Sequence, residues 1–141
     1  MNALQQLYHD TIRRHAADPV GYQKQIHPTH QHEGHNPQCG DRVEIRLKLV
    51  GGMIEDIAFE GEACTICMAS ASLMCEQVQG CGIHDLTALS QFLATRLKER
   101  EGPEDIGPLS PLLGVRPYPS RVQCATLPWD TAEKALTEGG T

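Results

Sequence analysis

The sequence predicts an α+β domain, in which a small antiparallel sheet packs against helices. Residues 42–50 alternate strictly between charged and apolar side chains, which is typical of a strand with one wet face. A second apolar run, at residues 53–61, follows Gly51-Gly52, so the two runs predict a hairpin. Apolar residues at helical spacing occur before and after this hairpin. Strands grouped in one part of the chain, with helices elsewhere, indicate the α+β class.

Composition narrows the classes of protein and function. A chain of 141 residues fits a single domain, 1–141, and 40% hydrophobic residues with only 4% aromatics predict an aliphatic core. The net charge of −6 argues against a nucleic acid or an anionic membrane as the main partner. No apolar run approaches the roughly 20 residues of a membrane span, and the first residues lack the apolar region of a signal peptide. We therefore expect a cytoplasmic protein.

The N-terminal part predicts one helix followed by an irregular segment. Residues 3–16 carry apolar residues at helical spacing, and Asp18-Pro19 should end that helix. Residues 17–38 have little periodicity, which predicts a loop or arm. This segment contains four histidines in the stretch "HPTHQHEGH". They could bind a metal, but a solvated polar loop is the favoured interpretation because no fixed spacing supports a site.

The second half predicts three helices. Small residues allow close packing of a helix at 65–79, with Gly80 as its stop and Cys64 at its N-terminus. Unpaired N–H groups and the helix dipole favour a thiolate there. A second helix follows at 84–99, and after a loop and an irregular stretch the last helix covers 121–136.

Six cysteines carry the chemical signal, because thiols in a reducing compartment indicate metal binding or reactivity more often than disulfides. Cys39, Asp41, Cys64 and Cys124 each lie at the end of a predicted element, where small domains gather sites on a rigid frame. Three thiolates and a carboxylate suit tetrahedral Zn²⁺, and thiolates also suit iron–sulfur clusters. Spacing alone does not establish that these segments converge.

Three motifs carry a family resemblance: "NPQCGD", "FEGEACTICMASASLM" and "SRVQCATLPW". Together, and in this order, they resemble the iron–sulfur assembly proteins of the IscU/NifU N-terminal family. His15 and Pro19 fit the start of that family. The SufU branch is the most similar, because the segment before the third motif is long and because Gln123 and Arg121 stand where SufU proteins differ from IscU proteins.

The resemblance implies a three-stranded antiparallel sheet with helices on one face and a further strand before Cys39. It also implies that Cys39, Asp41, Cys64 and Cys124 hold zinc, or alternatively iron or a 2Fe–2S cluster. SufU-like proteins accept sulfur from a SufS-type cysteine desulfurase and pass it on for cluster assembly and client proteins. In that reading the chain is a sulfurtransferase-like acceptor without turnover of its own, and Arg121 contacts a partner.

The acceptor role falls to Cys39, because this cysteine lies on a Pro/Gly turn that can move at small cost. A freed thiolate there would attack the desulfurase persulfide. Two other functions stay open: a scaffold that assembles a transient 2Fe–2S cluster on the same residues, and a zinc-stabilised binding module with no sulfur chemistry.

The sequence departs from the family at several positions. The family usually has Gly at Ala63, Ser at Cys67 and Lys at Gln123, and Pro128 should kink or restart the last helix. Cys67 completes a C-x-x-C with Cys64, so it could replace Asp41 as a ligand or resolve a persulfide on Cys64. A small buried side chain is the favoured interpretation. The remaining two cysteines, Cys75 and Cys81, are assigned to the core and to no role, respectively.

Overall fold

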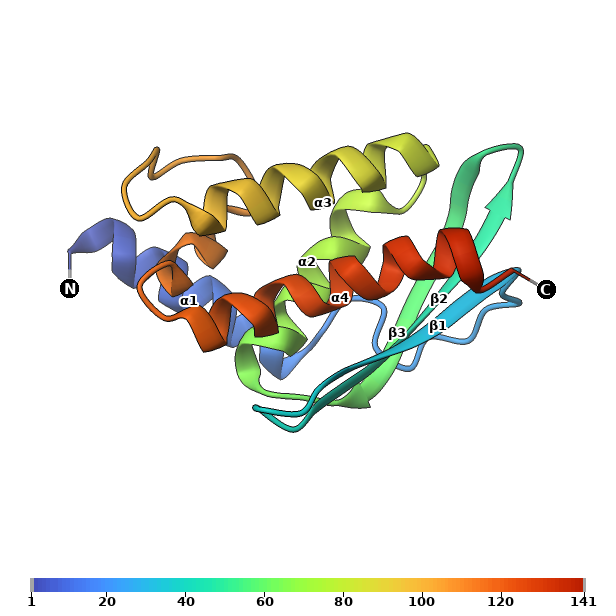
Figure 1. Ribbon diagram of the computed structural model, residues 1–141, viewed down its shortest axis with the longest axis horizontal. Helices are drawn as coiled ribbons and strands as arrows, with labels where there is room; N and C mark the ends of the chain where they lie inside the picture. The colour runs from blue at the N-terminus through green and yellow to red at the C-terminus, as the bar shows by residue number, and fades with distance from the viewer. Residues whose placement is uncertain (1, 141) are drawn as a thin grey trace.

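The computed structural model describes residues 2–140 and confirms the predicted α+β class. A three-stranded antiparallel sheet in the order β1-β2-β3 carries helices on one face (Figure 1). The elements in chain order are α1 (Ala3–Ala17), β1 (His30–Asn36), β2 (Asp41–Val50), β3 (Met53–Glu62), α2 (Thr65–Val78), α3 (Ile83–Lys98), the 3₁₀ helix η1 (Ser110–Val115) and α4 (Pro119–Glu138).

The central hairpin follows the alternation of the sequence. Val43, Ile45 and Leu47 of β2 are fully buried beneath the helices. The side chains between them face solvent and pair with β3, since Arg46 lies 2.8 Å from Glu60 across the hairpin. Each inward side chain removes apolar surface from water at roughly 25 cal/mol per Å², so this register is strongly specified.

Strand β1 corrects the prediction that residues 17–38 form only a loop or arm. Residues 30–36 pair antiparallel with β2, as the family resemblance implied, so the loop prediction is wrong for these seven residues. Alternate positions of this strand are the less exposed ones, and the residues there are His30, His32, Gly34 and Asn36. Because none of them is apolar, the hydrophobic period of a strand is absent from the sequence.

The helices form the second layer. Helix α4 lies along β1 and β2, while α2 contacts β3 and α4 (Figure 1). Gly34 permits the close approach of α4, because a Cβ on it would overlap the hydroxyl of Thr131. This approach brings the start of α4 to the end of β1, where the candidate site lies.

Helix α4 runs without interruption through Pro128, so of the two expected effects, a kink or a restart, the restart does not occur. Packing against α2 secures the residues on both sides of it. The Ser70 hydroxyl of α2 donates to the Ala125 carbonyl and accepts a hydrogen bond of 3.0 Å from the Trp129 indole. Trp129 is 1% exposed, and these contacts offset the missing backbone donor of the proline.

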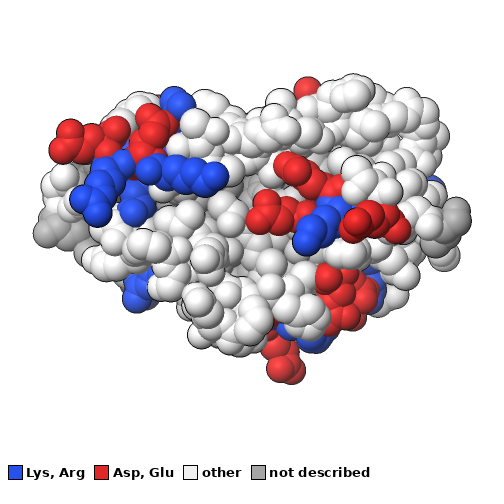
Figure 2. All heavy atoms as spheres, viewed as in Figure 1, with Lys and Arg blue, Asp and Glu red and all other residues white. Residues whose placement is uncertain are grey.

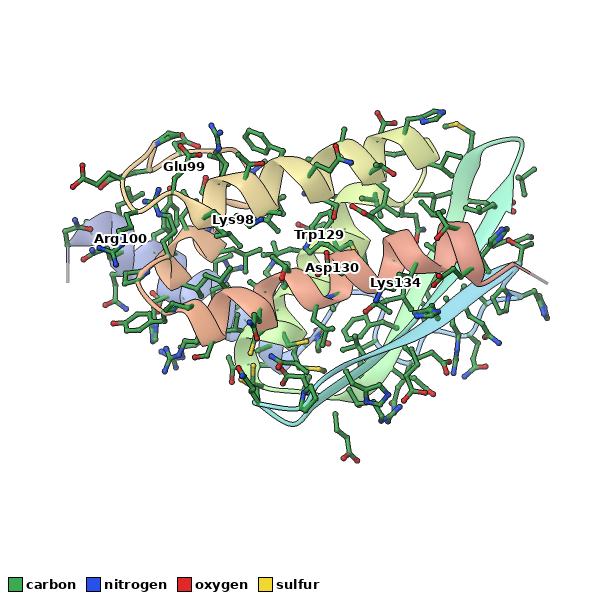
Figure 3. The ribbon with its side chains drawn as sticks, in the orientation of Figure 1. Lys98, Glu99, Arg100, Trp129, Asp130 and Lys134 are labelled. Atoms are coloured by element: carbon green, nitrogen blue, oxygen red, sulfur yellow. The ribbon has the colours of Figure 1, made fainter. Side chains whose placement is uncertain are left out.

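The outer side of α4 is polar. Figure 3 shows Asp130 and Lys134 on this side, with Lys98 at the end of α3. Burial and the Glu133 carboxylate raise the pKa of Asp130, against the opposing effect of Lys134 and Lys98. Acidic and basic side chains intermingle over this face, and uncharged residues separate two mixed groups (Figure 2). Within residues 2–140, no helix combines the length and apolar character that crossing a membrane requires.

Candidate metal centre

The turn between β1 and β2 presents Cys39. The Cys39 amide donates to the Asn36 carbonyl at 3.2 Å, which closes a turn over Pro37 and Gln38. Gly40 follows with φ +70°, a left-handed conformation that glycine adopts without strain. The turn leaves Cys39 exposed at the end of the hairpin formed by β1 and β2. The sequence "NPQCGD" therefore builds a short loop whose thiol is open to a partner.

Asp41 begins β2 and is only 2% exposed. One carboxylate oxygen, Oδ1, accepts the backbone N–H of Cys64 at 2.8 Å. The other, Oδ2, lies 3.9 Å from the Cys64 sulfur. Asp41 thus fixes the entry to α2 with one oxygen and turns the second toward the cysteine sulfurs.

Cys64 is the N-cap of α2, as the sequence predicts. Its extended backbone, φ −67° and ψ 166°, precedes the first helical turn. Its sulfur accepts the Cys67 N–H at 3.5 Å, which uses one of the unpaired donors at the helix start. Neighbouring Ala63, where the family usually has glycine, is absent from the residues with positive φ, so alanine fits this backbone.

Cys124 enters from α4 and is 1% exposed. The Asn36 side-chain amide donates to its sulfur at 3.6 Å, and its thiol donates to the Ser120 carbonyl at 3.4 Å. Burial raises the pKa of the Cys124 thiol, and the Asp41 carboxylate and the thiols of Cys39 and Cys64 raise it further. A metal bound here must displace that proton, so its affinity falls as the pH falls.

Three of the four predicted ligands converge. The ligand atoms of Cys39, Asp41 and Cys124 all lie within 4.8 Å of one another, and no other such group occurs among residues 2–140. Ligand sulfurs around tetrahedral zinc lie roughly 3.8 Å apart, so the three atoms already have a suitable spacing. Cys64 stands outside this trio and beside it, through its contact with Asp41. The donor set fits zinc.

Cys67 lies behind the trio. It is 0% exposed and packs with Val43 and Cys124 in a small cluster separate from the main core. Burial raises the pKa of its thiol, and the nearby Asp41, Cys64 and Cys39 add to the effect. The favoured prediction of a small buried side chain agrees with this burial, yet the residue also adjoins the candidate metal centre.

Arg121 lies on the first turn of α4, and its guanidinium stacks 5.2 Å from the centre of the Tyr118 ring. Both side chains line a groove that also includes Tyr8 of α1 and Ile66 of α2. Ile66 is two residues from Cys64, so the groove opens next to the candidate metal centre. Arg121 is therefore placed where a partner at the centre could reach it.

Sequence reasoning missed Asn36. It is 6% exposed at the end of β1, and its amide holds the Cys124 sulfur. Asn36 begins the motif "NPQCGD", where Asn-Pro indicates a turn. This local signal says nothing of the contact that its side chain makes with Cys124. The histidines around β1 form no metal-binding group within residues 2–140.

Comparisons with known proteins agree with this architecture. The family model described as "NifU-like N terminal domain" matches residues 7–138. A relative from Bacillus subtilis (strain 168), the "Zinc-dependent sulfurtransferase SufU", is 41% identical over 109 residues, which cover 74% of each chain. The "Iron-sulfur cluster assembly scaffold protein IscU" of Streptococcus pyogenes serotype M1 is 31% identical over 138 residues, or 96% of this chain and 86% of that protein.

Solved structures show the same fold. A putative iron-sulfur cluster assembly scaffold protein for the SUF system from Fervidobacterium islandicum superposes with a TM-score of 0.80 at 31% identity, covering 90% of this chain and 94% of that one. A NifU-like N-terminal protein from Brucella abortus gives a TM-score of 0.82 at 24% identity, with 96% of each chain covered, and supports the fold alone.

Proposed function

The chain belongs to the NifU-like N-terminal domain family, and on this premise we propose that it is a zinc-bound sulfur acceptor for iron–sulfur cluster assembly. The observation that carries the proposal is the convergence of an exposed thiol, Cys39, on two buried ligands, Asp41 and Cys124. Buried ligands suit a resident metal, whereas an exposed thiol suits exchange with a partner.

Cys39, Asp41, Cys64 and Cys124 are the residues that would hold zinc. Bound zinc would keep the three thiols deprotonated at neutral pH. The chain contributes the positions of these groups: Asn36 orients the Cys124 sulfur, and Asp41 fixes Cys64 through its backbone N–H. Only Cys39 sits on a turn rather than on a helix or at a helix start, so it is the thiol that can move most easily.

The transfer step is a thiol exchange with one additional sulfur. The Cys39 thiolate attacks the outer sulfur of a persulfide carried by a SufS-type cysteine desulfurase. The sulfur–sulfur bond of that persulfide breaks, and the cysteine of the desulfurase leaves as a thiolate. Cys39 then carries the persulfide, and cluster assembly consumes its outer sulfur.

The groove beside the site supplies the partner contact. Tyr118 is 53% exposed and carries the Arg121 guanidinium over its ring. Exposed tyrosine and arginine side chains are enriched where proteins bind one another. We place the desulfurase on this groove, with Arg121 at its edge and Cys39 within reach. The six free thiols suit the reducing cytoplasm.

A second candidate function is a scaffold for a transient 2Fe–2S cluster on the same residues. The similarity to the Streptococcus pyogenes scaffold protein, which extends over 96% of this chain, favours it. Metal content separates the two candidates: the acceptor retains stoichiometric zinc in air, whereas the scaffold holds iron with labile sulfide.

The decisive experiment mixes the protein with a SufS-type desulfurase and cysteine and follows the added sulfur by mass spectrometry. We expect one added sulfur on the peptide that contains Cys39, together with faster desulfurase turnover. Cys39→Ala should abolish both, while Cys81→Ala, a distant cysteine variant, should retain both. Sulfur that appears first on Cys64 or Cys124 would contradict the assignment of the acceptor. An absence of both sulfur gain and stimulation would favour the scaffold.

A further inference from the structure

Helix α2 begins with two cysteines in a relation that the sulfur acceptor role does not use. Cys64 is the N-cap and Cys67 is the third residue of the helix, so the two side chains belong to the same turn. Side chains at the N-cap and N3 positions reach back toward each other, as in a capping box. The contact already exists in one direction, because the Cys67 N–H donates to the Cys64 sulfur at 3.5 Å.

We propose that Cys64 and Cys67 form a dithiol pair that resolves a persulfide on Cys64 and releases its outer sulfur as hydrosulfide. The proposal rests on the sulfur acceptor function, which supplies the persulfide. It goes beyond that function because the chain would itself carry out the reduction that turns bound sulfur into free sulfide.

The positions of the two thiols support different roles. Cys64 is half-buried, and its thiol neighbours the Cys124 thiol, as does that of the exposed Cys39. It can therefore receive sulfur passed inward from Cys39. Cys67 is 0% exposed and meets no solvent-borne partner, which limits its exchange to groups inside the cluster. A partly exposed first thiol and a buried second thiol at a helix N-terminus are the arrangement of a C-x-x-C exchange centre.

The spacing also permits the product. A helix with a rise of about 1.5 Å per residue and a Cα radius of about 2.3 Å places Cα atoms three residues apart at about 5 Å, which lies within the roughly 4.4–6.8 Å that a disulfide spans. The other two cysteines of this region are excluded by position. Cys75 is eight residues beyond Cys67 and contacts Gly21, whereas Cys81 donates its thiol to the Gln77 carbonyl.

The step balances without an external oxidant. The Cys67 thiol attacks the inner sulfur of the Cys64 persulfide, a bond forms between the two cysteine sulfurs, and the bond to the outer sulfur breaks. The outer sulfur leaves with the electron pair and takes the Cys67 proton, which gives HS⁻. The two cysteines each lose one electron, and the sulfane sulfur gains two. A small-molecule thiol then reduces the disulfide to restore the pair.

The test uses the full-length protein loaded with sulfur, desalted and kept free of reductant. Inorganic polysulfide serves as a second loading agent, so that a failure of desulfurase transfer does not prevent the measurement. We expect hydrosulfide to appear with a yield approaching one per persulfide. Cys67→Ser and Cys67→Ala should load equally and release at least tenfold less.

A matched control is Cys75→Ser, which alters a buried cysteine of the same helix. It should release hydrosulfide like the unchanged protein. In this variant the fragment between Glu62 and Glu76 holds only Cys64 and Cys67, so a disulfide appears as a mass loss of two hydrogens. Rapid release from folded, loaded Cys67→Ser, or release without that disulfide, would overturn the proposal. A chain that accepts sulfur from polysulfide and not from the desulfurase would instead contradict the proposed function.

Discussion

The two ends of helix α2 hold the same residue type in different chemical surroundings. At the N-terminal end, Cys64 and Cys67 meet the β1–β2 turn and the start of α4, where Asp41 and Cys124 lie. At the C-terminal end, Cys75 is 2% exposed and packs beside Gly21. No second thiol or carboxylate joins Cys75 in a metal-binding group within residues 2–140.

The difference shows that the chemistry of a thiol depends on which other chain segments end beside it. Burial raises the pKa of both Cys67 and Cys75, so burial does not distinguish them. What distinguishes the N-terminal end is a carboxylate and three further thiols from three different elements. If function follows this convergence, changes at the N-terminal end of α2 should affect metal binding and changes at its C-terminal end should not.

The largest expected effect is the loss of metal at the N-terminal end. Cys64→Ala removes one proposed ligand and the N-cap of α2, so most of the zinc should be lost. Because metal-binding energy is folding energy, the melting temperature should fall by about 10 °C or more. Metal analysis and thermal unfolding measure the two effects.

Cys81→Ala is the control from the opposite end of the helix. Cys81 is partly exposed, and its thiol donates to the Gln77 carbonyl at 3.4 Å. The variant should keep its zinc, with a change in stability within about 0.5 kcal/mol. Full zinc and an unchanged melting temperature in Cys64→Ala would show that the convergence does not bind metal.

The two ends of α2 also differ in what the sequence could predict. Cys64 as N-cap and Gly80 as the stop followed from local signals, since Gly80 has φ +83° just beyond the helix. The convergence of Cys39 with Cys124 did not follow, because it depends on packing between segments 85 residues apart. The family motifs supplied what spacing could not.

Two further differences from the sequence predictions have physical causes. Strand β1 lacks apolar residues on its inward face, so its sequence shows no hydrophobic alternation. Gly34 lies on this face and allows the close approach of α4. Pro128 stays within a continuous helix because Ser70 and Trp129 connect α4 to α2 around it. Tertiary contacts override the local signal in both cases.

An intermediate effect is expected from two glycines at the C-terminal end of α2. Gly21 and Gly80 both have positive φ, +81° and +83°, but only Gly21 meets a neighbour. A Cβ on Gly21 would lie 2.8 Å from the Cys75 sulfur, whereas nothing lies within 4 Å of one on Gly80. Gly80→Ala should cost about 1–2 kcal/mol through backbone strain, and Gly21→Ala at least about 1 kcal/mol more through overpacking.

Urea unfolding of both variants measures the difference. Combining Gly21→Ala with Cys75→Ala removes the sulfur and should recover the overpacking part while leaving the backbone strain. Equal costs for the two single variants would mean that Cys75 is not packed against this turn, and the description of the C-terminal end as a tightly packed region would then fail.

The smallest effect over a single pH unit is a pH dependence of stability, which tests whether the thiol of Cys75 has a purely structural role. Burial raises the pKa of Cys75 to about 12 in the folded chain, against an opposing effect of Lys24 and an ordinary value of 9.0. Below pH 9 the thiol is neutral in both states and stability is unaffected. Above pH 9 the thiol of the unfolded chain ionises first, so the stability should fall toward pH 12 by at most about 1.4 kcal/mol per pH unit.

Cys75→Ala should remove this part of the alkaline slope in zinc-saturated protein. Ala71→Gly, which weakens the same helix without removing a thiol, should keep it. If Cys75→Ala unfolds with an unchanged slope between pH 9 and pH 11, Cys75 ionises as easily in the folded chain as in the unfolded one, and the contrast between the two ends of α2 is lost.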